Sequence, residues 1–206
     1  MEKIGAARVL SKDTLRQWTS GRRLALACLV IAGLTALTWW IAQVHQRSQV
    51  RELLNKAGPI VSPPMELQFA ARQPDSPDRL AVLAPGERAG YWIVRHNQPA
   101  SEVDVLLTRT GQKYFSVVGK SVVATFHAGT RQITSVDGLK DSDTTREVSF
   151  TYIWTVVQPP TAVLGAATPS LGREYKGEAI LVRSAGTWQL AHWSMPEFEE
   201  AISQFH

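Results

Sequence analysis

Hydrophobic residues follow three patterns along the chain of 206 residues. Residues 24–42 contain no charge, no side-chain amide and no proline. Residues 46–56 repeat apolar side chains on one helical face, and a Gly-Pro pair then ends the pattern. Residues 147–157 alternate between apolar and polar side chains, which is typical of a half-buried antiparallel strand. The chain therefore combines a long N-terminal helix with a β-rich part.

The uncharged run predicts a transmembrane helix over 24–43. Its first 19 residues would form a helix of about 28 Å, close to the ~30 Å hydrocarbon core of a bilayer. Arg22 and Arg23 precede the run, and Trp39 and Trp40 stand near its far end, where their rings would sit among the headgroups. These four residues are the predicted interfacial anchors.

Two alternatives remain for this run, a buried helix of a soluble protein and a cleaved signal peptide. The length without charge favours a membrane span over a buried helix. A signal peptide would have an apolar run of ~7–15 residues and a small-residue cleavage site, neither of which is present. Six basic residues precede the run, so the positive-inside bias predicts a cytoplasmic N-terminus and an exported C-terminal domain.

Small residues recur at helical spacing within the same run. Cys28, Ala32 and Ala36 occupy positions i, i+4 and i+8, and Gly33 is adjacent. Small side chains let two membrane helices approach closely, so this stripe is the predicted helix-packing surface and would permit a homo-oligomer. The alternative is that Ala and Gly are simply frequent in such helices.

Shorter elements are predicted after a Pro-rich connector. Ser101 followed by Asp104 resembles a capping box, which predicts a helix over 101–111. A final short helix is predicted to begin at Ser194-Met195-Pro196-Glu197. β-prone segments cover 80–83, 91–94, 116–126, 131–136, 176–183 and 187–193.

Two tryptophans in the last of these strands are candidate partner contacts. The separation of Trp188 and Trp193 is odd, so strict alternation would place them on opposite faces of the strand. One of them would then point away from the helix-covered face. Exposed tryptophans are typical anchors at protein interfaces.

The order of elements predicts an α+β fold in four segments: a cytoplasmic tail (1–23), the transmembrane helix (24–43), a juxtamembrane helix and connector (44–64) and an exported domain (65–206). This order resembles that of NTF2-like, cystatin-like domains. In architecture only, it also resembles two groups of bitopic bacterial inner-membrane proteins, the scaffold subunits of type IV secretion systems and the Mce-associated membrane proteins. The resemblance implies a curved antiparallel sheet and a location in the bacterial inner (cytoplasmic) membrane, with the C-terminal domain periplasmic or extracytoplasmic. It implies the lipid bilayer and other envelope proteins as partners, and it assigns no functional residue.

The distribution of charged residues along the chain argues against one class of partner, nucleic acid. The chain has 22 basic and 18 acidic residues, of which six and two precede residue 24, so the remainder is balanced. A nucleic-acid-binding domain would have a basic surplus, and no nucleic-acid partner is therefore expected. The single cysteine lies inside the apolar run, so neither a disulfide nor cysteine catalysis is expected in the exported part.

Motifs for catalysis, metals and cofactors are absent from the sequence. The five histidines lack metal-ligand spacing, and no nucleophile elbow, phosphate loop or dinucleotide fingerprint is present. Asp137, Asp141 and Asp143 indicate turns rather than a calcium loop, because Leu139 and Lys140 interrupt the ligand spacing. We therefore expect no catalytic residue, metal or cofactor.

These observations predict a non-enzymatic, membrane-anchored interaction or scaffold subunit of a bacterial envelope complex, such as secretion or transport machinery. The alternative is a tethered small-ligand binder or a ketosteroid isomerase-like enzyme that uses the cavity of the cone, with Tyr152 or Tyr114 in its acid–base pair. The interior of the sheet distinguishes the two. A filling of aromatic side chains favours the interaction function, and a hollow with two perturbed ionisable groups favours the enzyme.

Overall fold

The computed structural model describes the backbone of residues 12–97 and 100–205, with side chains from Leu29 onward except at 197 and 198. The chain divides into two compact units, 1–46 and 47–206. Helix α1 (Lys12–Lys56) forms the described part of the first unit, and its last turns belong to the second.

Among the residues whose side chains are described, no helix is long and apolar enough to cross a lipid bilayer. This finding overturns the transmembrane helix predicted over 24–43 and the inner-membrane location that depended on it. The uncharged run inside those residues covers only 29–42, which corresponds to about 21 Å of helix. Thr35 and Thr38 also lower its hydropathy, and their hydroxyls donate to backbone carbonyls one turn earlier. Residues 24–28 lie outside the described side chains.

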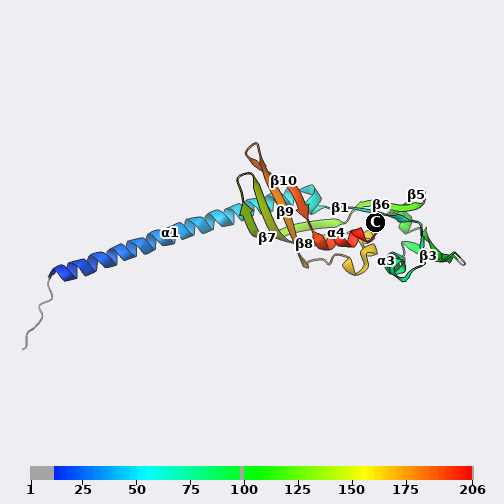
Figure 1. The fold of residues 1–206 in the computed structure, drawn as a ribbon, viewed down its shortest axis with the longest axis horizontal. Helices are drawn as coiled ribbons and strands as arrows, with labels where there is room; N and C mark the ends of the chain where they lie inside the picture. Colours follow the sequence, from blue (N-terminus) through cyan, green and yellow to red (C-terminus); the bar gives the residue numbers. More distant parts are fainter. Residues whose placement is uncertain (1–11, 98–99, 206) are drawn as a thin grey trace, which may run out of the picture. The chain divides into compact units, whose positions relative to one another are not determined.

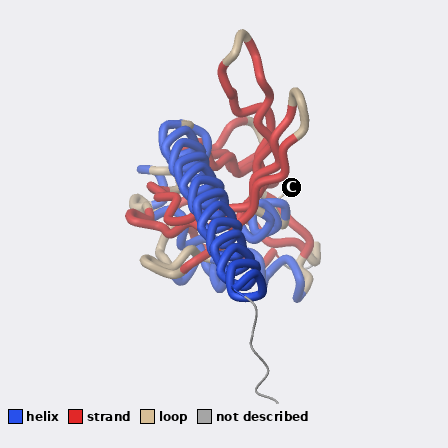
Figure 2. The backbone as a smooth tube through the Cα atoms, turned by 90° about the vertical axis from the view of Figure 1, so that its left-hand side faces the viewer, coloured by secondary structure: helices blue, strands red, loops and turns tan. Residues whose placement is uncertain are grey.

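The second unit is mostly antiparallel sheet. The largest sheet has the order β10-β9-β8-β7. Its strands are β7 (Gly129–Asp141), β8 (Thr145–Val157), β9 (Glu174–Ser184) and β10 (Thr187–Ser194). The predicted strand over 147–157 and the hairpin at 184–186 are confirmed, and Ala185 and Gly186 both have the positive φ that a tight hairpin turn requires. Figure 2 shows the turns of the β7–β8 and β9–β10 hairpins extending beyond the rest of the sheet.

Two smaller sheets complete this unit, and Figure 1 shows them toward the end where β3 and β5 lie. One has the order β1-β6-β5 and the other β2-β4-β3. Their strands are β1 (Pro64–Ala70), β2 (Arg72–Pro74), β3 (Trp92–Asn97), β4 (Glu102–Leu107), β5 (Ser116–Val118) and β6 (Ser121–His127). The helical segments are α2 (Gly58–Val61), α3 (Pro77–Arg88), η1 (Gly111–Lys113), η2 (Pro159–Ala167) and α4 (Pro196–Ser203).

Two predicted elements are of the wrong type. The segment predicted as a helix over 101–111 contains strand β4, in which Val103 and Val105 alternate with half-buried carboxylates. Ser101 has a positive φ instead of the extended conformation of a helix cap. The segment predicted as a strand over 80–83 lies inside α3, whose start is marked by Pro77 in the first turn.

The predicted fold class is wrong as stated. The prediction was an α+β fold with a transmembrane helix and one curved NTF2-like or cystatin-like sheet. The structure has three antiparallel sheets, and none of its described helices can span a membrane. The physical reason is local pairing, because β1 pairs along its whole length with β6 in a separate sheet. Met65, Leu67 and Phe69 alternate in β1 and supply the buried face of that sheet.

The core is continuous through the second unit. At one end, Trp92 packs edge-on against Phe69 and Phe115, and its indole N–H donates to the Leu83 carbonyl of α3 at 2.9 Å. At the other, Val50 and Leu54 from the last turns of α1 are fully buried. These residues show that the end of α1 is part of the folded domain.

The end of α1 also covers part of one edge of the four-stranded sheet, at Ile133 and Thr134 of β7. The Asn55 side chain accepts from the backbone N–H of Ile133 in β7 at 2.8 Å and donates to the carbonyl of the same residue at 3.2 Å. Arg51 donates to the next carbonyl, that of Thr134, at 3.4 Å. Helix side chains therefore satisfy backbone groups of β7 that a neighbouring strand would otherwise bind.

We expect Asn55→Ala to lower the free energy of unfolding by about 1–3 kcal/mol, because it leaves a part-buried N–H and C=O of β7 without their partners. Urea denaturation of the variant and the parent chain measures the change. Ser48→Ala, at an exposed position of the same helix, is the matched control and should leave the urea midpoint unchanged. Equal midpoints for Asn55→Ala and the parent would contradict the edge-closing role.

Candidate functional site

The outer edge of β10 differs from the outer edge of β7. β10 is the other terminal strand of the sheet and pairs only with β9, and within the described residues no strand lies along its outer side. An edge strand presents a row of outward N–H and C=O groups that can pair with another chain. β10 therefore offers a backbone surface that β7 has lost to α1.

An apolar groove runs beside this open edge, between β10 and the last turns of α1. Its volume is about 520 Å³. The lining residues are Gln49, Glu52, Leu53, Lys56, Ala57, Trp188, Gln189 and Leu190. Glu52 and Lys56 form an ion pair of 2.7 Å on the rim, which leaves the groove without net charge. The groove therefore suits an uncharged, apolar partner surface.

A β-bulge places the two candidate tryptophans on the same face. Leu190 pairs with Leu181 and Trp193 pairs with Ala179, so one extra residue is inserted in β10 between these pairs. Opposite residues in an antiparallel pair share a face, and Leu181 and Ala179 are both buried on the inner face of β9. The expectation of opposite faces, which assumed strict alternation, is therefore wrong. Trp188 and Trp193 are both half-buried against the core.

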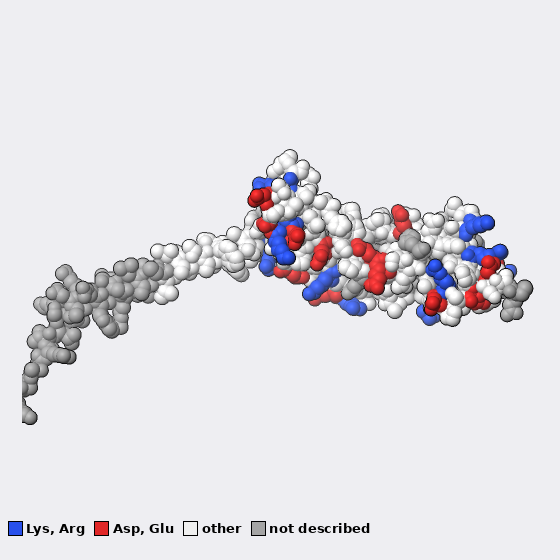
Figure 3. Space-filling model, in the orientation of Figure 1, with Lys and Arg blue, Asp and Glu red and all other residues white. Residues whose placement is uncertain are grey.

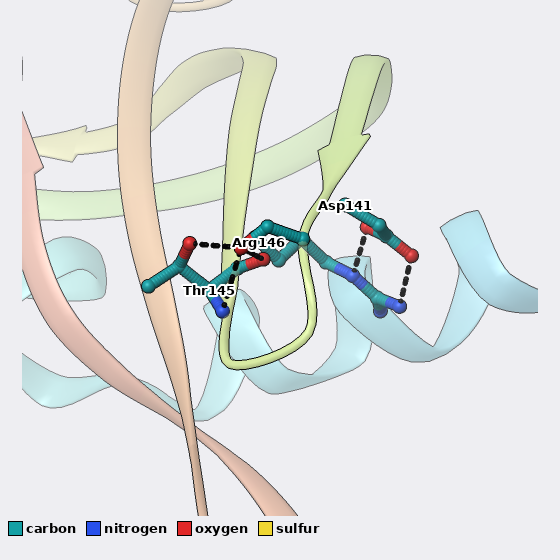
Figure 4. A network of polar contacts seen from close by, with 4 residues as sticks. Asp141, Thr145 and Arg146 are labelled. Atoms are coloured by element: carbon teal, nitrogen blue, oxygen red, sulfur yellow. Dashed lines mark hydrogen bonds and ion pairs between the residues drawn. The ribbon is translucent and has the colours of Figure 1, made fainter.

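Trp188 rests on a buried arginine. The Arg146 guanidinium lies 4.4 Å from the centroid of the Trp188 ring. The same guanidinium makes two charge-assisted hydrogen bonds to Asp141, at 2.6 and 2.8 Å, shown in Figure 4. The side chain of Arg146 is only 7% exposed, so the Asp141 carboxylate and the Trp188 ring together compensate a charge removed from water. This stack fixes the orientation of Trp188 at the end of the groove.

The inner face of the same sheet is filled by aromatic side chains. Phe150, Tyr152 and Trp154 occupy alternate positions of β8 and are at most 1% exposed. Tyr152 stacks on Tyr175 of β9 with ring centroids 5.5 Å apart. These rings leave little accessible surface of their own on this face of the sheet.

A second buried arginine lies at the far end of this stripe. The guanidinium of Arg131 in β7 lies 4.4 Å from the Trp154 ring centroid and 5.2 Å from that of Tyr152, and it contacts the sulfur of Met195. Burial lowers the pKa of Arg131 to about 10, and the charges of Tyr152 and Glu199 partly oppose that shift. Arg131 therefore remains positively charged at neutral pH.

Other ionisable candidates form local contacts. Hydrogen bonds from the hydroxyls of Ser135 and Thr151 lower the pKa of Asp137, while Asp141 is engaged by Arg146. Within the described part of the chain, no three metal-ligating side chains come together. Tyr114 is exposed and packs edge-on against Tyr91, far in sequence from Tyr152. The contacts of Asp137 and Asp141 are those of strand and turn residues.

The remaining sequence-predicted residues lie in the first unit. Ala32, Gly33, Ala36, Trp39 and Trp40 are exposed on α1. Cys28, Arg22 and Arg23 fall outside the described side chains.

Sequence reasoning missed Leu53, Arg146 and Arg131 as site residues. The burial of Arg146 could have been predicted from the sequence. It precedes Val148 and Phe150 at a spacing of two, so the alternation of β8 places it on the buried face. The burial of Arg131 was harder to predict, because register shifts in β7 break the alternation around it.

Comparison with known proteins identifies no relative of this chain. No protein family, no curated protein and no solved structure matches the chain. The resemblance to type IV secretion scaffold subunits and Mce-associated proteins therefore stays a prediction from architecture.

We expect Arg146→Lys to loosen the β9–β10 hairpin, because lysine retains the charge and loses both the two-pronged bond to Asp141 and the planar stack on Trp188. Hydrogen exchange followed by mass spectrometry should show amides of 180–190 exchanging faster. Arg183→Lys is the control, since Arg183 pairs with Trp188 in register and is exposed at the hairpin end. Unchanged exchange in Arg146→Lys would mean that the stack does not hold the hairpin.

Proposed function

We propose that this protein is a non-enzymatic interaction module that binds an extended segment of a partner protein along the outer edge of β10. The observation that carries the proposal is the asymmetry of the sheet: helix side chains bond to the middle of the β7 edge, and no described strand pairs with the outer edge of β10, which lies beside an apolar groove. Strand addition is a recurring mode of peptide recognition in which the backbone supplies affinity and alternate side chains supply specificity.

The chemistry of the groove identifies the partner segment. An added strand would turn every second side chain toward Leu53, Trp188 and Leu190, and these residues favour apolar partners. The rim is neutral because Glu52 and Lys56 pair with each other. The partner is therefore a segment with apolar residues at alternate positions and little net charge.

The charge distribution supports a protein partner over nucleic acid. Basic and acidic side chains are interspersed over the face of the second unit in Figure 3, without a field of one sign. A nucleic-acid interface would gather Lys and Arg on one surface. A scaffold role in an envelope complex is compatible with strand addition, and no comparison bears on it.

The proposal is tested by selecting peptides from a random displayed library on the intact chain. We expect the selected peptides to carry apolar residues at alternate positions and to protect amides of β10 from hydrogen exchange. Leu53→Lys should weaken their binding about tenfold or more, because it places a charge in the apolar groove. Circular dichroism and the urea midpoint show whether this variant remains folded.

The matched control is Ile180→Lys, which makes the same kind of change at an exposed position on the outer face of β9 and should leave binding intact. Equal binding by Leu53→Lys, or protection of strands other than β10, would overturn the proposal. Concentration-dependent self-association that protects β10 would overturn it in another way, because the occupant would then be a second copy of the chain.

A further inference from the structure

A cavity of about 150 Å³ lies where the buried stripe of β8 ends, beneath the segment that connects β8 to β9. Tyr152 and Trp154 of β8 and Tyr175 of β9 supply aromatic walls. Residues 166–169 form the opposite wall, and Arg173 lies just before β9. The groove beside β10 shares none of these lining residues.

The wall formed by the connecting segment is held in place. Val163 and Leu164 of η2 are buried in the core. Gly165 has a positive φ, and an added Cβ would lie 2.8 Å from Pro85 of α3, so only glycine fits this close approach. The backbone N–H of Ser170 donates to the Tyr175 hydroxyl at 2.9 Å. The cavity is therefore preformed, which lowers the entropic cost of binding.

Two cations set the sign of its potential. The Arg131 guanidinium stacks on Trp154 and Tyr152, and the Arg173 guanidinium lies 5.2 Å from the Tyr175 ring centroid. The carboxylate that acts on Arg131 is Glu199, which accepts from the backbone N–H of Met195 at 3.0 Å. No carboxylate lines the cavity itself. An ionised ligand thus meets Arg173 in the cavity wall and experiences the field of Arg131, which is buried against the Trp154 and Tyr152 rings.

This arrangement reverses the usual preference of an aromatic box. Clustered tyrosine and tryptophan rings normally attract cations to their faces. Here arginines already stack on all three rings, so a second cation would gain little from the rings and would be repelled by Arg131 and Arg173. An anion gains both the attraction and a fixed guanidinium fork.

We propose that this cavity binds a small aromatic carboxylate, with its carboxylate on the Arg173 guanidinium and its ring between Tyr175 and the wall formed by residues 166–169. The size agrees with this ligand class, because a volume of about 150 Å³ is enough for one benzene-sized ring. The Tyr175 hydroxyl accepts from Ser170 and keeps its own proton to donate to the ligand. This site does not rest on strand addition at β10, and either can fail alone.

The test is a titration of the intact chain with three probes of one shape, benzoate, benzamide and benzylamine, followed by backbone amide NMR. Benzoate should bind with a dissociation constant of about 1 mM. It should shift amides of 166–175, and its affinity should exceed that of benzylamine about tenfold or more. Comparable affinity for benzylamine, shifts outside these residues, or no saturable shift by about 10 mM benzoate would each overturn the proposal.

Two variants separate the charge from the cavity. Arg173→Gln should weaken benzoate about tenfold or more and leave benzamide unchanged, because it removes only the charge at an exposed position. Ala167→Leu should weaken both probes by filling the cavity from an exposed position on its wall. Arg183→Gln, which removes a charge from the distant hairpin, should change neither affinity. Full benzoate affinity in Arg173→Gln would show that the guanidinium does not bind the carboxylate.

Discussion

Every open antiparallel sheet has two edges whose backbone groups need partners, and this constraint organises the second unit. Asn55 takes the place of a neighbouring strand at β7 by accepting from and donating to the same residue, Ile133. Val50 and Leu54 of the same helix bury apolar surface close by, so packing holds the helix where Asn55 can reach the edge. A single helix end thus closes one edge and forms one wall of the groove beside the other. The interaction surface is a consequence of how the sheet is closed.

Buried arginines form the second organising feature. Arg146 and Arg131 each lie 4.4 Å from a tryptophan ring, one near each end of the inner stripe of β8. Arg146 makes a two-pronged bond to Asp141, whereas the Arg131 guanidinium contacts the rings of Trp154 and Tyr152 and the Met195 sulfur. Burial lowers the pKa of Arg131 to about 10. The charge of Arg131 also exerts its field on the adjacent cavity, which the Trp154 and Tyr152 rings line.

The sequence predicts the second half of the chain better than the first. Strict alternation identified β8, and the turn residues at 184–186 identified the β9–β10 hairpin, because both are local signals. The helix predicted over 101–111 failed because a capping-box spacing outweighed the alternation of Val103 and Val105. The faces of Trp188 and Trp193 could not be predicted, since the bulge in β10 appears only when β9 supplies the register. Leu53 and Arg131 likewise became site residues only through contacts between distant segments.

The two proposed sites share β8 and remain physically separate. From Arg146 beneath Trp188 to Trp154 in the cavity wall the strand covers roughly 27 Å at the rise of an extended chain. Val148 and Phe150 fill the interval and are almost fully buried, so no open channel joins the groove to the cavity. A peptide along β10 would contact Trp188 and Leu190, and a small carboxylate would contact Tyr175 and Arg173. Because the close-packed interval must stay intact for either site to form, the stability of the β8 stripe limits both.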